Sequence, residues 1–150
     1  MADLPLDCAS ARVRGELGKL ANLNPLLYGI LLEIAAYALA TWGWRVFVLS
    51  IFRDAAEEAR TDAASKLGLG RKPGTRSPHA FWLALDIRTV GVDPEWVEAL
   101  DAWINARWQY DPARPEMTVS DIKPHGTGIH LHLQAQRGMT RRRPETEGAG

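Results

Sequence analysis

Two short segments, 83–88 and 129–134, alternate apolar and polar side chains, and this alternation constrains the fold of the chain most strongly. Successive side chains of a β-strand point to opposite faces, so each segment predicts a strand with one apolar and one polar face. The polar faces carry Ala84, Asp86, Arg88, His130 and His132. We therefore expect two strands that pack on one core and present metal-binding groups on the other side.

A third candidate ligand, His79, lies just before the first of these strands. Together with Asp86 and His132 it gives a set of two imidazoles and one carboxylate. Three protein ligands with an open fourth position are typical of catalytic rather than structural zinc. The sequence therefore predicts a Zn2+ site held by His79, Asp86 and His132.

The same residues carry a family resemblance. Ser77-x-His79-x4-Ala84-x-Asp86, followed by a late His-x-His, resembles the zinc D-alanyl-D-alanine carboxypeptidase and L-alanyl-D-glutamate endopeptidase family, whose fold is shared with the hedgehog signalling domain. The family motif is Ser-x-His-x-x-Gly-x-Ala-x-Asp, and Trp82 stands where the glycine is usual. The resemblance implies an α+β fold in which a small antiparallel sheet carries the zinc site and helices flank it.

The second motif departs from this family at one position. Many members place a glutamate base three residues before the last zinc histidine, and that position is Ile129. The His-Leu-His form is similar to lysostaphin-type and penicillin-insensitive murein endopeptidases, in which the second histidine binds zinc and the first assists catalysis. This implies that His132 is a ligand and His130 the catalytic base, with His125 as a reserve candidate.

Substrate-binding residues are expected before the first motif. The segment Ser50-Ile-Phe-Arg53 resembles the family's Ser-Gly-Tyr-Arg, whose arginine polarises the scissile carbonyl, and the alternative is a solvated arginine at a strand end. A cationic loop flanks the motif, and it either attracts a carboxylate-bearing peptide or forms an ordinary solvated surface. The candidates for substrate binding in this region are Arg71, Lys72, Arg76 and Ser77.

Composition indicates one compact domain. The chain has 150 residues, of which 46% are hydrophobic, and 18 basic residues balance 18 acidic ones, so overall charge indicates neither nucleic acid nor a membrane as partner. The single Cys8 excludes an intramolecular disulfide framework. We expect an N-terminal segment over 1–23, a peptidase domain over 24–136 and a disordered tail over 137–150.

Local patterns predict the remaining elements. Asn24-Pro25 caps a helix over 26–42 that ends at Gly43, and its length and Glu33 favour a core helix over a membrane span. Further strands are expected over 44–50 and 117–122, and a loop over 124–128. Further helices are expected from about Ser10, over 54–67 and from Pro94, the last with a core-facing stripe that includes Trp96 and Trp103.

The resemblance implies hydrolysis of a peptide bond in bacterial peptidoglycan, of the L-Ala-D-Glu or D-Ala-D-Ala type, with the stem peptide as substrate. Residues 1–20 lack the apolar stretch of a secretory signal. We therefore expect a chain that is cytoplasmic as synthesised and does not insert stably into membranes. An endolysin-like phage protein, released through a holin, would fit this description.

Two other functions remain open. His130-Leu-His-Leu-Gln134 also resembles the His-x-His-x-Gln signature of histidine-triad nucleotidyl transferases, which need no zinc and leave the first motif unexplained. A zinc-stabilised binding domain of the hedgehog type, without hydrolysis, is the other alternative, and Trp82 and Ile129 keep it open.

Overall fold

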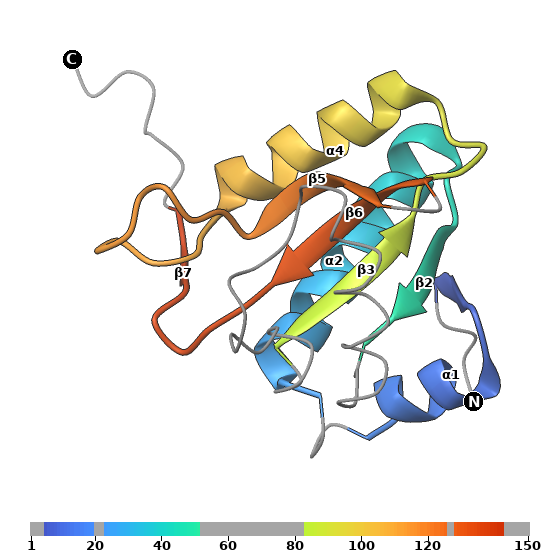
Figure 1. The fold of residues 1–150 in the computed structure, drawn as a ribbon, viewed down its shortest axis with the longest axis horizontal. Helices are drawn as coiled ribbons and strands as arrows, with labels where there is room; N and C mark the ends of the chain where they lie inside the picture. Colours follow the sequence, from blue (N-terminus) through green and yellow to red (C-terminus); the bar gives the residue numbers. More distant parts are fainter. Residues whose placement is uncertain (1–4, 20–22, 52–82, 126–127, 143–150) are drawn as a thin grey trace.

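The computed structural model describes residues 5–19, 23–51, 83–125 and 128–142, which form a five-stranded sheet with helices packed on one face (Figure 1). The strand order is β1-β2-β3-β6-β5, and β4 and β7 form a separate two-stranded ladder. The strands are β1 (Leu6–Cys8), β2 (Val46–Ser50), β3 (Ala84–Arg88), β4 (Trp108–Gln109), β5 (Ser120–His125), β6 (Gly128–Gln134) and β7 (Thr140–Arg141). The helices are α1 (Ala11–Leu17), α2 (Pro25–Trp42) and α4 (Pro94–Arg107).

This architecture confirms the predicted α+β class with a small sheet flanked by helices. The sheet is mixed rather than wholly antiparallel, because β1 pairs parallel to β2 while β2, β3, β6 and β5 pair antiparallel. In Figure 1, α2 runs behind the strands and α4 follows the β5 edge. The strands and helices share one apolar core, whose sheet side includes Val46, Val48, Leu85, Ile87, Leu131 and Leu133.

Helix α2 begins and ends where its sequence predicts. The Asn24 side chain accepts hydrogen bonds from the backbone N–H groups of Leu26 and Leu27, and Gly43 ends the helix with φ at 67°, a left-handed conformation that glycine adopts without strain. Among the described residues, α2 is the one helix whose length and composition would also suit a membrane span. Its buried face belongs to the core described above and comprises Leu27, Ile30, Leu31, Ile34, Ala35 and Ala38.

Helix α4 covers the core beside α2. Val97, Leu100 and Ile104 are buried, which confirms the predicted core-facing stripe. The half-buried ring of Trp103 stacks on that of Tyr37 in α2, with ring centroids 4.0 Å apart. Trp103 therefore joins α4 to α2.

Polar side chains of α4 also hold strand β5. The Asn105 amide accepts from the Ser120 N–H at 3.0 Å and donates to the Ser120 carbonyl at 2.9 Å. The Ser120 hydroxyl donates to Asp101 at 2.7 Å, and Ser120 is only 2% exposed. This contact makes Asp101 part of the helix–strand interface.

The described chain extends the folded unit beyond the expected domain boundaries at both ends. In the segment 1–23, β1 joins the sheet, and Val13 and Leu17 of α1 are buried in the core. Beyond residue 136, Met139 packs against the same core and β7 pairs with β4. Apolar residues at these two ends find partners that are distant in sequence, so local composition did not reveal them.

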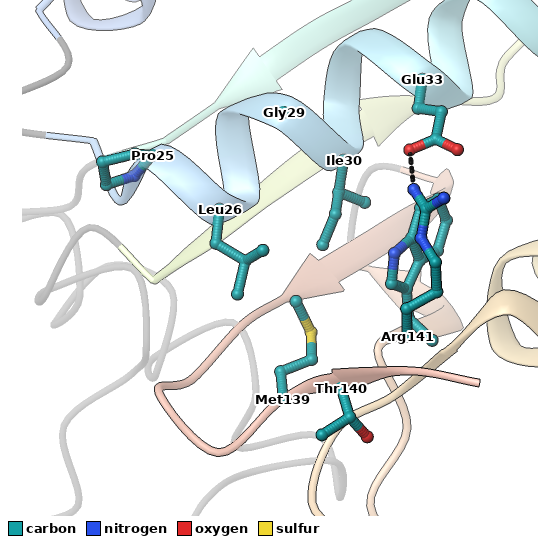
Figure 2. A pocket seen from close by; sticks show the side chains of 9 residues that line it. Pro25, Leu26, Gly29, Ile30, Glu33, Met139, Thr140 and Arg141 are labelled. Carbon is teal, nitrogen blue, oxygen red and sulfur yellow. Dashed lines mark hydrogen bonds and ion pairs between the residues drawn. The ribbon is translucent and has the colours of Figure 1, made fainter. Parts of the chain in front are cut away.

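Glu33 ties β7 to the helices. Its carboxylate accepts from Arg107 of α4 and from Arg141 of β7, each at 2.6 Å. Figure 2 shows Glu33 above Arg141 at one end of a groove between α2 and residues 139–141. The one acidic residue of the apolar α2 helix thus has a structural partner on α4 and another on β7.

Strand β5 differs from its predicted bounds. It begins at Ser120 and continues to His125, so Pro124 pairs with Ile129 where a loop was predicted. Proline lacks an N–H but is tolerated because β5 is an edge strand. The helix predicted over 54–67 lies outside the described residues.

We expect Asn105→Ala to lower the free energy of unfolding by about 1–3 kcal/mol, because it leaves buried backbone groups of Ser120 without their side-chain partner. Urea denaturation followed by circular dichroism measures the change. Glu98→Ala, at an exposed position on the same helix, is the control and should change stability by less than about 0.5 kcal/mol. Equal effects of the two substitutions would contradict a role for the Asn105 contact.

A second prediction concerns pH. Burial raises the pKa of the Asp101 carboxyl above its usual 3.8, opposed by the Ser120 hydrogen bond and aided by Asp121. The folded state therefore holds this proton more tightly than the unfolded state, so the carboxyl's contribution to stability declines as pH rises above about 3.8. Asp101→Asn keeps the acceptor for Ser120 and cannot ionise. Its stability relative to the unsubstituted protein should rise with pH from about 3 upward in urea titrations, and a constant difference would refute this assignment.

Candidate metal centre

Strands β3 and β6 bring three polar residues together. The antiparallel register sets Asp86 directly opposite His132 and Arg88 opposite His130. Residues directly opposite on neighbouring strands share a face of the sheet. Since Leu85, Ile87, Leu131 and Leu133 occupy the core face, Asp86 and both histidines lie on the other one.

The three side chains, here called the Asp86 cluster, are in contact. His132 Nδ1 lies 3.0 Å from Asp86 Oδ1, and His130 Nε2 lies 3.4 Å from the same oxygen. One ligand atom from each residue can be chosen so that all three atoms lie within 4.8 Å of one another. The cluster is buried, with Asp86 6% exposed and each histidine 7%.

These distances suit a shared metal ion. Two ligand atoms about 2.0–2.1 Å from a tetrahedral ion are about 3.3–3.4 Å apart. The separations of 3.0 and 3.4 Å from Asp86 Oδ1 are close to that value. Asp86, His130 and His132 could therefore hold one metal ion, with Asp86 as the central ligand.

The geometry gives His130 a possible role that its sequence position did not suggest. The sequence assigned His130 to catalysis and His132 to metal binding. In the structure both imidazoles approach the same carboxylate oxygen, so His130 is also placed as a ligand.

Ile129 stands where the resembling peptidases have their glutamate base, and it lies on the other face of β6 from the cluster. Side chains alternate along β6, so residue 129 points to the face opposite the one that carries His130 and His132. Its side chain is 56% exposed, and its carbonyl accepts a hydrogen bond from Thr89. A glutamate at this position in this register would point away from the cluster.

Strand β2 leads toward the same site. Its pairing with β3 shifts between Val48 and Ser50, and the irregularity sets Ser50 opposite Asp86. Ser50 is the first residue of the segment that was predicted to carry Arg53 to the site. The segment thus begins beside the cluster, and Arg53 itself lies outside the described residues.

The other predicted site residues are described only in part. His125 is the last residue of β5, where its backbone pairs with Gly128. Besides Arg53, five predicted residues lie outside the described part of the chain: Arg71, Lys72, Arg76, Ser77 and His79. Gln134, the last residue of the His-x-His-x-Gln segment, donates its side-chain amide to the Thr118 carbonyl.

Three charged residues near the cluster were not predicted as site residues. Arg88 lies opposite His130 on β3, and on β5 Lys123 lies opposite His130 and Asp121 opposite His132. The alternation of β3 already placed Arg88 on the polar face. Lys123 and Asp121 could be placed beside the histidines only from the register of β5 with β6. The sequence predicted this strand over 117–122, too early in the chain.

The groove of Figure 2 is a separate feature. It has a volume of about 290 Å³ and lies between the first half of α2 and residues 139–141. It shares no residue with the Asp86 cluster, and Glu33 and Arg141 at its edge are engaged with each other.

Comparisons with protein-family models, with curated proteins and with solved structures find no match for this chain.

We expect Asp86→Ala to weaken metal binding by more than about 100-fold, because outer partners of metal ligands alone contribute about 10–100-fold. Metal content after dialysis, measured by plasma mass spectrometry, and titration with a competing chelator test this. Glu98→Ala on α4 is the control, because it removes an exposed carboxylate from a helix that packs on the core and not on the face with the cluster. Unchanged metal content in Asp86→Ala would show that Asp86 does not hold a metal ion.

The same titration assigns His130. We expect His130→Ala to weaken metal binding as well, because His130 Nε2 approaches the central oxygen of Asp86. Full retention of the metal in His130→Ala would instead support its predicted role in proton transfer.

Proposed function

We propose that the chain is a zinc-dependent peptidase that hydrolyses a peptide bond in bacterial peptidoglycan. The observation that carries the proposal is the contact of Asp86 with His132 and His130 across two paired strands. The aspartate belongs to the Ser77–Asp86 motif and the histidines to the late His-x-His motif, the two features that resemble the cell-wall peptidase family. A fold of the hedgehog and DD-peptidase kind belongs to the same proposal.

The donor set fits zinc. Two imidazoles and one carboxylate, with a further position open to water, are typical of catalytic zinc sites. A bound zinc ion supplies a water whose pKa is lowered to about 7 and polarises the scissile carbonyl. The same donors also occur in non-haem iron enzymes, so metal analysis should include iron.

The protein's own residues would orient this chemistry. Asp86 contacts both imidazoles and so restrains the rotation of each ring. Burial on the sheet face limits access of bulk water and strengthens electrostatic interactions inside the site. With His79, Asp86 and His132 as the zinc ligands, His130 would move a proton and Arg53 would contact the oxyanion. If His130 is a ligand, it would take the third position in place of His79, so that one position stays open.

The alternatives make different predictions. In the histidine-triad alternative a histidine attacks a phosphate without zinc, and Asp86 has no assigned role. In the binding-domain alternative the protein holds zinc and recognises a wall peptide without cutting it. The position of Ile129, on the face opposite the cluster, is compatible with this alternative because the usual glutamate base is absent.

Digestion of purified peptidoglycan tests the proposal. We expect the zinc-loaded protein to release peptides that mass spectrometry identifies, and chelation to abolish their release. Asp86→Ala and His132→Ala should lower the rate by more than about 1,000-fold, since metal activation of the nucleophile would be lost. Glu98→Ala, at an exposed position on α4, should retain the rate of the unsubstituted protein.

The outcomes separate the three functions. Zinc binding with no released peptide would support the binding domain. Absence of zinc together with turnover of a nucleotide phosphoramidate would support the histidine-triad alternative. Either result would overturn the peptidase proposal.

A further inference from the structure

The face that carries the Asp86 cluster is organised in two rows across β3, β6 and β5. In the first row the register aligns Asp86, His132 and Asp121. In the second row it aligns Arg88, His130 and Lys123. His130 thus has a cationic residue opposite it on each neighbouring strand, Arg88 on β3 and Lys123 on β5. This row lies two residues along the strands from the row of Asp86.

Arg88 is the less neutralised of these two cations. It is exposed, and its guanidinium lies 5.6 Å from the centroid of the Phe47 ring. Within the described part of the chain, no carboxylate lies within ion-pair distance of Arg88. Contact with the ring face orients the guanidinium but leaves its N–H groups available for an anion.

Lys123 contributes a weaker positive charge. Its Nζ lies 3.8 Å from Asp121 Oδ2, and both side chains are about half exposed. A pair of this length in water contributes little. Asp121 offsets part of the lysine charge, so an anion over this row would bind principally to Arg88.

We propose that Arg88, assisted by Lys123, binds a free carboxylate on the substrate residue that follows the scissile peptide bond. The inference rests on the proposed peptidase function and specifies the substrate class of that site. Arginine presents two parallel N–H groups that match the two oxygens of a carboxylate, which makes it the better anchor of the two.

The spacing of the rows supports this assignment. Neighbouring strands are about 4.8 Å apart, and residues two apart along a strand are separated by about 6.8 Å. The Asp86 cluster spans both rows, since His130 lies in the second and its Nε2 is 3.4 Å from Asp86 Oδ1. One substrate residue spans at most about 3.6 Å. The arginine side chain, with three methylene groups before its guanidinium, can cover the remaining distance to a carboxylate one residue beyond the scissile carbonyl.

This requirement selects among cell-wall peptide bonds by chemistry. The terminal residue of a D-alanyl-D-alanine end carries a free carboxylate. A D-glutamate that continues the peptide through its side chain also keeps a free α-carboxylate next to the L-alanyl bond. Bonds followed by an amidated residue or by a cross-bridge lack this group, so we expect them to be poor substrates.

Matched synthetic peptides test the inference. The probes are diacetyl-L-lysyl-D-alanyl-D-alanine, acetyl-L-alanyl-γ-D-glutamyl-L-lysine and the same two peptides with the relevant carboxylate converted to an amide. For whichever pair the zinc-loaded protein cuts, kcat/KM should favour the carboxylate form by at least about 10-fold, mainly through KM, because the anion contact is already made in the bound ground state.

Arg88→Ala should remove this preference while leaving the rate on the amide form and the zinc content unchanged. Arg88→Lys should retain part of it, and Lys123→Ala should reduce it less than Arg88→Ala does. Arg14→Ala, which removes an exposed arginine from α1, is the matched control and should keep the full preference.

The results separate this inference from the peptidase function. Equal cleavage of the acid and the amide by the unsubstituted protein overturns the inference and leaves the peptidase function intact. If neither peptide is cut, isothermal titration with the same peptides still decides. Preferential binding of the acid that is lost in Arg88→Ala supports the carboxylate site, and equal binding of the two forms refutes it.

Discussion

The pairing of β3 with β6 is the constraint on which the rest of the site depends. In this register Asp86 faces His132, and a shift by one residue would turn either set of side chains to the other face of the sheet. The shift would remove Leu131 and Leu133 from the core and place histidines there instead. Each apolar side chain so exposed would cost about 1.5–3 kcal/mol, so burial of the core face holds the polar face in place.

The helices stabilise this register from the core side. α2 and α4 bury their apolar faces against the strands, and stacking of Tyr37 on Trp103 joins the two helices. Asn105 holds the start of β5 through two hydrogen bonds to Ser120, which helps to set its register against β6. The second row of the site therefore depends on contacts on the opposite face of the sheet, because Lys123 lies beside His130 only when β5 is in place.

Several features could be predicted from local sequence because their causes are local. Asn24 and Gly43 determine where α2 begins and ends, and alternation along 83–88 and 129–134 determines which residues share a face. Other features could not be predicted because their partners are distant in sequence. β1 has only three residues and depends on its pairing with β2. Met139 packs on core residues that are distant in sequence, and Asp101 accepts a hydrogen bond from Ser120 of β5.

The candidate site likewise has features that local sequence predicts and features that depend on residues distant in sequence. The sequence by itself determined that Asp86, His130 and His132 would occupy the polar faces of two strands, because the period of a β-strand is a local property. Only the tertiary structure decided that these strands are neighbours, that both imidazoles approach the same carboxylate oxygen and that Arg88 and Lys123 flank His130. Which strands pair, and in which register, depends on how apolar surfaces from the whole chain are buried together, and no single segment contains that information.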